Sequence, residues 1–214
     1  MPIPELARRC RVIIISVPIA ATLDVIQLVG PHLPADSLLM DFTSLKEGPV
    51  RTMLEATAAE VIGCHPLFGP DCPSLDGQNV VLCPGRGGRW FGWLEGLLAN
   101  KGAHVTVTTP AEHDRMMALV QGLTHLETIL LGLTLRDFSI EESTLDAFST
   151  PIFRTKRAIV NKVFDAHPEL YAGILAGNSQ MPAIFNRYEK NLSRLKELVL
   201  NGNSARLADL LKKP

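Results

Sequence analysis

The chain has 214 residues, of which 46% are hydrophobic and 20% are charged, and its formal net charge is −1. This length supports one large domain or two small ones with a sizeable buried core. A near-neutral balance with interspersed signs excludes the strong field that holds nucleic acids or anionic membranes, so we expect neither as a partner. We expect that no apolar run is long enough to span a bilayer.

Four cysteines occur without paired C-x-x-C spacing: Cys10, Cys64, Cys72 and Cys83. In a chain of this size they indicate reduced thiols of a cytoplasmic protein rather than a disulfide framework. The apolar run that begins at Val12, after three arginines, imitates a signal peptide. Its short length and β-branched residues favour a buried parallel strand instead.

Residues 1–109 alternate between short apolar runs and amphipathic stretches, which is typical of a largely parallel sheet with helices on its faces. The predicted strands are Val12–Val17, Leu38–Phe42, Val61–Cys64, Asn79–Cys83 and Val105–Val107. The predicted helices are Thr22–Val29, Pro49–Ala58 and Trp90–Asn100. In such a sheet ligands gather at the carboxyl ends of the strands.

The pattern changes at Pro110, which separates an α/β half, residues 1–109, from an all-α half, residues 110–214. Pro110 and the acidic residues after it are typical of the first turn of a helix. A stripe of Met and Leu from Met116 to Leu133 recurs at helical spacing and indicates burial in a bundle or against another subunit. Further helices are predicted over Ile152–Phe164, Pro168–Leu175, Ala183–Leu200 and Ala205–Leu211.

The glycine signature G-x-G-x-x-G between a strand and a helix, which marks dinucleotide-binding domains, is absent from these residues. The nearest candidate runs from Gly85 to Trp90, but Trp90 stands where close helix packing requires the third glycine. We interpret this stretch as a plain glycine turn.

Polar side chains follow the ends of two neighbouring predicted strands. Thr43, Ser44 and Lys46 lie in the loop after one strand, and His65 follows the next strand, before a rigid Pro-Leu-Phe-Gly-Pro corner. Because parallel strands end at the same edge of a sheet, we expect a hydroxyl, a cation and an imidazole in one crevice. The alternatives are a helix cap for Ser44 and a solvated charge for Lys46.

Two histidines lie in the first helix of the second half. His125 is four residues after Gln121, so these two share a helix face. A lone histidine on such an apolar face is ordinarily a satisfied core residue. For His113, which stands between Glu112 and Asp114 in the first turn, we favour capping and dipole interactions. No set of His, Cys, Asp or Glu stands at zinc spacing, so no metal site is predicted.

The cations of one predicted helix include Arg154, Arg157 and Lys162. Arg154 and Lys162 are about 80° apart in azimuth at ~100° per residue, so both can face one cavity. Cations on a mostly apolar helix indicate an anionic ligand such as a dicarboxylate. The alternative is surface solubility.

Six stretches of the chain resemble prephenate dehydrogenases, most closely the form that is fused to chorismate mutase in enteric-type bacteria. They are VIIISVPI, DFTSLKEGPV, GCHPLFGPD, EHDRMMALVQGLTH, STPIFRTKRAIVNKVF and HPELYAGIL. The resemblance runs from about Glu5 onward, and the six stretches stand in the same order and at similar spacing as in the family. We identify no chorismate mutase segment in these residues.

The resemblance implies NAD(P)-dependent oxidative decarboxylation of prephenate, or of its amino analogue arogenate, on the route to tyrosine. His65 matches the histidine that accepts the proton of the ring hydroxyl, and Ser44 matches a serine beside the nicotinamide and that hydroxyl. The other assignments are substrate contacts at Gln121, His125, Arg154, Lys162 and Tyr171, and cofactor contacts at Ser16, Val17, Pro18, Thr43 and Lys46.

The chain departs from the family pattern at two places. Lys162 stands where the family has its principal carboxylate-binding arginine, and a lysine offers a point charge instead of two parallel bonds, so part of that role is expected at Arg157 or Arg154. The family also has a strand–helix–strand dinucleotide unit, of roughly 30 residues or more, ahead of the residues seen here. We therefore expect an incomplete Rossmann-like domain that binds NAD or NADP weakly.

The resemblance also concerns assembly. It implies that the all-α half is a dimerisation domain and forms an intertwined homodimer. The alternative to an enzyme is a non-catalytic remnant that dimerises or binds an aromatic ligand.

Overall fold

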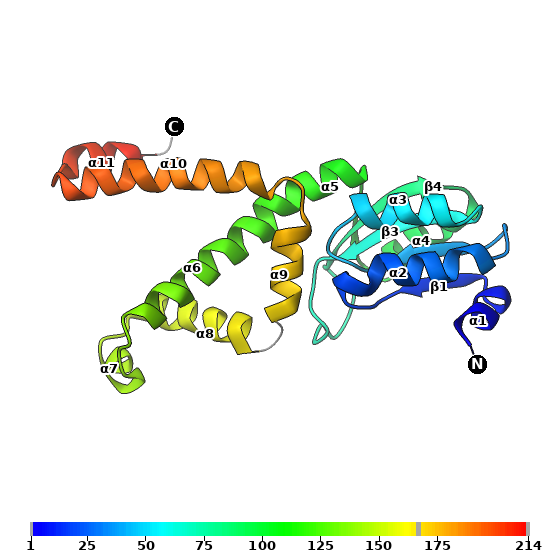
Figure 1. The fold of residues 1–214 in the computed structure, drawn as a ribbon, viewed down its shortest axis with the longest axis horizontal. Helices are drawn as coiled ribbons and strands as arrows, with labels where there is room; N and C mark the ends of the chain where they lie inside the picture. Colours follow the sequence, from blue (N-terminus) through cyan, green and yellow to red (C-terminus); the bar gives the residue numbers. More distant parts are fainter. Residues whose placement is uncertain (1, 166–167, 213–214) are drawn as a thin grey trace.

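The computed structural model describes residues 2–165 and 168–212, which form an α/β half and a helical half (Figure 1). Residues 1 and 214, the outer ends of the two predicted domains, lie outside the described residues, as does His167 at the start of the HPELYAGIL stretch. The α/β half is compact, whereas the helices of the other half extend away from it (Figure 1).

One 5-stranded sheet forms the centre of the α/β half, with its strands in chain order. They are β1 (Val12–Ile15), β2 (Leu38–Asp41), β3 (Glu60–Pro66), β4 (Asn79–Arg86) and β5 (His104–Val107). Neighbouring strands are parallel except for β3 and β4, which are antiparallel. The prediction of a largely parallel sheet is confirmed, and the reversed strand follows because residues 67–78 return the chain without a helix.

Helices cover both faces of this sheet because strand side chains alternate between its faces. Helices α1 (Ile3–Arg9), α2 (Ile19–Val29) and α3 (Glu47–Ala56) pack on the face that carries Ile13, Ile15, Leu39 and Val61. Helix α4 (Arg89–Asn100) packs on the opposite face, which carries Leu38, Met40, Ile62 and Cys64. In the stretch interpreted as a glycine turn, Gly85 and Arg86 end β4, Arg89 and Trp90 begin α4, and Gly87 and Gly88 connect the two elements.

The helical half begins with α5 (Pro110–Met117), a π-helical segment η2 (Ala118–Gly122) and α6 (Leu123–Asp137). It continues with α7 (Glu142–Ala147), α8 (Pro151–Asp165), α9 (Pro168–Gly177), α10 (Met181–Leu200) and α11 (Ser204–Leu210). Helix α9 lies between α6 and the sheet, and α10 and α11 extend away from both (Figure 1). The predicted helices of both halves are present, whereas α1 and α7 were not predicted.

The run from Pro110 to Asp137 is continuously helical, and by length and composition it could cross a membrane; 28% of its most apolar window is buried. The expectation that no run is long enough is therefore wrong, because η2 joins α5 to α6 without a break. The first turns of the run are packed on the α/β half, where His113 and Asp114 are buried. Farther along, Val120 is 54% exposed, so much of the apolar surface is uncovered in the single chain.

Candidate active site

A cavity of about 350 Å³ lies where the two halves meet, and we call it the junction cavity. Its walls come from the loop after β2, the end of β3 and the following loop, η2, α6 and α9. The lining residues are Phe42, Ser44, His65, Pro66, Leu67, Phe68, Gly69, Gln121, His125, Leu170, Tyr171 and Ile174. The cavity thus lies at the carboxyl edge of the parallel strands, where ligands of such sheets bind.

His65 stands at the end of β3 with only 3% of its surface exposed. Its Nδ1 lies 2.9 Å from Nε2 of His113, and its Nε2 lies 3.5 Å from Nε2 of Gln121. Burial lowers the pKa of His65 to about 3, with smaller contributions from His113 and Lys46. The imidazole is therefore neutral near neutral pH and has a lone pair that can accept a proton.

His113 is buried and forms part of the site instead of capping α5. Its Nδ1 lies 2.7 Å from Oδ1 of Asp114, and its Nε2 faces His65. The interpretation of His113 as a capping residue is wrong, because Thr109 is the N-cap and accepts the backbone N–H of Glu112 at 3.2 Å. The sequence signal that could have found this residue is the adjacent His-Asp pair at a helix start beside the boundary between the halves.

Asp114 joins the helical half to the α/β half. Its Oδ1 accepts the backbone N–H of Lys46 at 2.8 Å, and its Oδ2 accepts that of Glu47 at 2.9 Å. These are free N–H groups at the start of α3, so a carboxylate from α5 caps α3 across the junction. Sequence reasoning missed this role, since 68 residues separate Lys46 from Asp114.

Lys46 does not reach the junction cavity. Its side chain is fully buried and forms an ion pair with Asp41, and its Nζ donates to the backbone oxygen of Cys64 at 3.0 Å. The prediction that Lys46 projects into the crevice is wrong, and so is the alternative of a solvated charge. The reason is that a carboxylate at the end of β2 draws the ammonium group inward.

Thr43 is also turned inward, where its backbone N–H donates to Asp41 Oδ2 at 3.0 Å and its hydroxyl to the backbone oxygen of Leu45 at 2.9 Å. Ser44 is the half-buried hydroxyl residue of this loop that lines the junction cavity, together with Phe42. It is not the N-cap of α3, since that position is held by Lys46.

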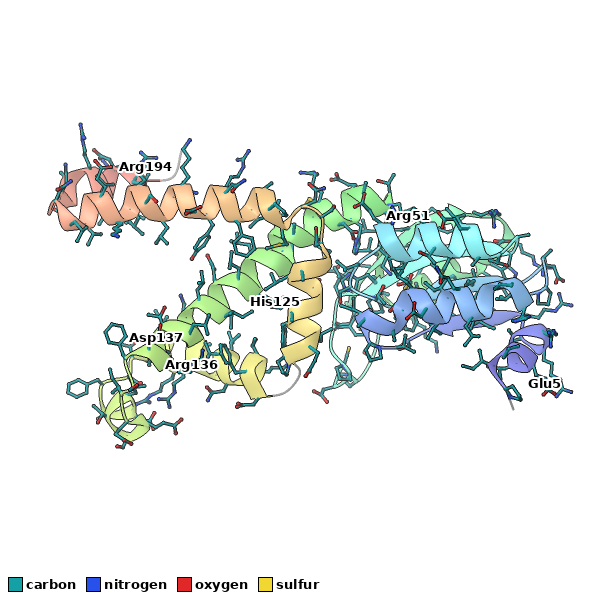
Figure 2. The ribbon with its side chains drawn as sticks, viewed as in Figure 1. Glu5, Arg51, His125, Arg136, Asp137 and Arg194 are labelled. Atoms are coloured by element: carbon teal, nitrogen blue, oxygen red, sulfur yellow. The ribbon has the colours of Figure 1, made fainter. Side chains whose placement is uncertain are left out.

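Gln121 and His125 both line the junction cavity, as their shared helix face predicts. Gln121 comes from the π-helical segment, and its buried Oε1 has no hydrogen-bond partner among the described residues. His125 lies on α6, on the side of α9 (Figure 2), and contacts the Tyr171 ring of α9 edge-on, with ring centroids 4.9 Å apart. Burial lowers the pKa of His125.

The three α8 cations proposed from the sequence, Arg154, Arg157 and Lys162, are not brought to the junction cavity in the single chain. Arg154 and Lys162 are exposed, and Arg157 forms an ion pair with Asp146. The described residues that line the cavity include no lysine or arginine. The substrate contacts expected at Arg154 and Lys162 are therefore not found at this cavity within one copy.

A second cavity of about 460 Å³, which we call the strand-end cavity, lies beside the first. It is mainly apolar, with Ser16 and Phe42 at the ends of β1 and β2, and Cys64, Pro66 and Phe68 from β3 and its loop. Phe42 lines both cavities. Within residues 2–165 and 168–212, no group of three or more His, Cys, Asp or Glu could hold a metal ion.

Two family models match the chain in succession. The one described as prephenate dehydrogenase, nucleotide-binding domain, matches residues 3–107, and the one described as prephenate dehydrogenase, dimerization domain, matches residues 109–213.

Two curated relatives are similar to the chain. A probable arogenate/prephenate dehydrogenase from Methanocaldococcus jannaschii is 35% identical over 213 residues, which are 97% of this chain and 48% of that protein. A T-protein from Haemophilus influenzae is 39% identical over 173 residues, 81% of this chain and 46% of that protein. The chain thus spans about half the length of the curated relatives that it matches.

Solved structures share the fold. A prephenate dehydrogenase from Aquifex aeolicus in complex with hydroxyphenyl propionate and NAD+ has a TM-score of 0.82 at 21% identity, covering 99% of this chain and 77% of that one. An arogenate dehydrogenase from Synechocystis has a TM-score of 0.75 at 20% identity, covering 97% and 78%. Since the two family models together extend over residues 3–107 and 109–213, the chain belongs to the prephenate dehydrogenase family.

Proposed function

We propose that this chain carries the active site of an NAD(P)-dependent dehydrogenase that oxidatively decarboxylates prephenate or arogenate in the synthesis of tyrosine. The observation that carries the proposal is the junction cavity. It places a buried, neutral histidine, His65, beside Ser44 and Gln121 at the carboxyl ends of parallel strands. A proton acceptor next to a hydroxyl and an amide suits the removal of a proton from an alcohol.

The strand-end cavity fits the nicotinamide end of the cofactor, because it is largely apolar and adjoins the junction cavity through Phe42. Ser16, Val17, Pro18 and Phe42 would hold that end of the molecule at the ends of β1 and β2. When bound, the cofactor supplies the acceptor for the hydride. Thr43 and Lys46, both turned inward, shape the loop that carries Phe42 and Ser44.

His65 and Ser44 carry the proton chemistry. In the proposed reaction the ring carbon that bears the hydroxyl gives up a hydride, and the hydroxyl gives up its proton to His65 Nε2. The bond from the ring to its carboxylate then breaks, carbon dioxide leaves, the electron pair of that bond makes the ring aromatic, and the ring oxygen takes back a proton to become a phenol. Ser44 lines the same cavity and would hydrogen-bond the reacting oxygen.

The side chains of α6 and α9 would hold the rest of the substrate. His125 and Tyr171 form an aromatic wall of the junction cavity, and Gln121 presents its amide beside His65. The substrate's carboxylates need cations, and we assign this task to Arg154 and Lys162, which are exposed on α8 and available to the assembled protein.

We further propose that the protein is a cytoplasmic homodimer. The family model over residues 109–213 is described as a dimerization domain, and η2 and α10 expose large apolar residues such as Val120, Leu192 and Val199. Burial of this surface against a second copy would stabilise the assembly through the hydrophobic effect and would cover the apolar run of residues 110–137 without a membrane. Four free cysteines suit a reducing compartment.

The test is a turnover assay on the full chain with prephenate and with arogenate, each combined with NAD and with NADP, read from the absorbance of the reduced nicotinamide. We expect turnover with at least one combination. His65→Asn should lower kcat by about 10²–10⁴-fold, the usual contribution of a general base. Its affinity for hydroxyphenyl propionate should stay near that of the parent, because the proton transfer belongs to the transition state.

His104→Asn is the matched control, since His104 is an exposed histidine on β5, away from both cavities, and should keep the parental kcat. Hydroxyphenyl propionate binding without turnover in any combination would overturn the proposal in favour of a non-catalytic aromatic-ligand-binding protein.

A further inference from the structure

We propose that His113 and Asp114 are positioning residues for His65. Together the three form an imidazole relay, Asp114–His113–His65, that holds His65 in the tautomer with its hydrogen on Nδ1 and its lone pair on Nε2, facing the junction cavity. The inference deepens the proposed function, since it names what makes His65 a proton acceptor on the correct side of its ring.

The direction of each hydrogen bond in the relay follows from Asp114. Its carboxylate faces three N–H donors: the backbone groups of Lys46 at 2.8 Å and Glu47 at 2.9 Å, and Nδ1 of His113 at 2.7 Å. A carboxylate among donors acts as an acceptor only, so His113 carries its hydrogen on Nδ1. Nε2 of a neutral His113 is then an acceptor. It lies 2.9 Å from Nδ1 of His65, which must therefore donate.

The other side of the His65 ring agrees with this assignment. His65 Nε2 lies 3.5 Å from the amide nitrogen of Gln121, which is a donor and not an acceptor. If His65 Nε2 carried a hydrogen, two donors would face each other. A lone pair on His65 Nε2 can instead accept the hydrogen of the Gln121 amide. Two independent neighbours, His113 and Gln121, thus favour the same tautomer.

The relay matters because an unconstrained neutral histidine favours the opposite tautomer, with the hydrogen on Nε2. In that state His65 would present a donor to the junction cavity and could not take the proton of a substrate hydroxyl. The relay also stabilises the charge that develops on His65 during transfer, since its Nδ1–H is directed through His113 to a carboxylate. This is the role that a third residue plays in serine-protease triads.

The relay crosses the junction between the two halves. His65 lies at the end of β3, whereas His113 and Asp114 lie on α5, and Asp114 also caps α3. The side-chain amide of Asn178, just after α9, donates to the backbone oxygen of Asp114 at 2.8 Å and secures it from the other side. Because Asp114 also caps α3, a substitution there would disturb the fold as well as the relay, so His113 is the residue that is varied.

The decisive measurement is long-range ¹H–¹⁵N NMR of the full chain with ¹⁵N-labelled histidine, at about pH 8, above the ordinary histidine pKa. This spectrum reports directly which ring nitrogen carries the hydrogen. We expect the Nδ1–H tautomer for both His65 and His113. In His113→Leu the acceptor is gone, so His65 should switch to the Nε2–H tautomer.

Two further variants complete the design. In His113→Gln the side-chain oxygen can accept the His65 Nδ1–H, so the tautomer should be retained although the link to Asp114 is lost. His104→Leu removes an exposed histidine and should leave the His65 signals unchanged. If His113→Leu does not fold, the spectrum of the parent and that of His113→Gln still decide the question.

Turnover separates positioning from mere structural support. We expect His113→Leu to lower kcat on the order of 100-fold with little change in KM, and His113→Gln to restore part of it. An Nε2–H tautomer of His65 in the parent, or an unchanged tautomer in His113→Leu, would overturn the relay. The NMR measurement uses no substrate, so a confirmed tautomer without turnover would reject the proposed function and leave the relay standing.

Discussion

Lys46 and Asp41 form a fully buried ion pair next to the strand that carries His65. Lys46 Nζ also donates to the backbone oxygen of Cys64, the residue before His65, at 3.0 Å. The second carboxylate oxygen, Asp41 Oδ1, is buried with no hydrogen-bond partner among the described residues. The pair therefore holds the ends of β2 and β3 together, and removal of one partner leaves a buried charge.

Lys46→Met should lower the free energy of unfolding by about 3–5 kcal/mol, because Asp41 is then an uncompensated charge in the interior. Urea unfolding followed by circular dichroism measures the change. The exposed Lys101→Met should remain within about 0.5 kcal/mol of the parent. The double variant Lys46→Met with Asp41→Asn should lose less than Lys46→Met alone. Equal losses in the single and double variants would contradict the pairing.

His65 also makes stability depend on pH. Its pKa is lowered to about 3 by burial, whereas in the unfolded chain a histidine titrates near its ordinary pKa of about 6.5. Below about pH 6.5 the unfolded state therefore binds a proton that the folded state refuses, so stability falls as the pH is lowered toward 3. The contribution of His65 to the free energy of unfolding is fully present above about pH 6.5.

We expect the free energy of unfolding to fall between about pH 7 and about pH 5, and to fall less in His65→Gln, which lacks the group. Urea unfolding at both pH values measures the two differences. His104→Gln, which removes an exposed histidine, should keep the pH dependence of the parent. The same pH dependence in His65→Gln and in the parent would show that His65 is not the group responsible.

At the scale of elements, the packing of α6 against α8 depends on a glycine. A Cβ at Gly132 would lie 2.7 Å from Cζ of Phe164 and 2.9 Å from Cγ1 of Val160, closer than real side chains approach. The two helices approach each other closely at this point because Gly132 on α6 has no side chain that would separate them.

Gly132→Ala should therefore destabilise the protein by about 1–3 kcal/mol through overpacking, although alanine is the better helix former. Gly96→Ala in α4 is the matched control, because a Cβ there meets no atom within 4 Å. It should stabilise by about 0.5–1 kcal/mol. Thermal unfolding of both variants gives the comparison, and a more stable Gly132→Ala would mean that α8 does not contact α6 as described.

The way in which β3, α5 and η2 meet at the candidate site also depends on whole elements. The π-helical segment carries Gln121 to His65, and the first turn of α5 carries Asp114 to the start of α3. Segments of this kind often mark functional sites, because the extra residue turns a side chain out of regular helical register.

At the scale of the whole molecule, the helical half leaves large apolar side chains exposed in the single chain. Helices α10 and α11 extend away from the rest of the protein (Figure 1), and α10 exposes Leu192 and Val199 by 52% and 58%. Exposed apolar faces of this extent are typical of interfaces between subunits. This agrees with the proposed homodimer.

Light scattering on the full chain should give the mass of two copies at micromolar concentration. Leu192→Glu combined with Val199→Glu places two charges on the apolar face of α10 and should shift the protein toward the monomer. Leu97→Glu, which changes a 42% exposed leucine on α4 in the α/β half, should remain dimeric. A parent chain that is monomeric under these conditions would contradict the proposal.

Much of the fold could be predicted from local pattern. The alternation of short apolar runs and amphipathic stretches predicts the strands and their helices, and Pro110 predicts the change to an all-α half, because period and helix-start chemistry are properties of neighbouring residues. The position of His65 at a strand end follows in the same way, and so does the shared face of Gln121 and His125.

What only the tertiary structure decided involves residues far apart in the chain. His65 and His113 are separated by 48 residues, and Lys46 and Asp114 by 68, so no local pattern predicts that they bond. The inward turn of Lys46, the antiparallel β4 and the exposure of Arg154 and Lys162 also depend on what packs against them. The physical reason is that the sequence determines which groups can donate, accept or carry charge, whereas burial and partners are set by which distant segments the packed core brings together.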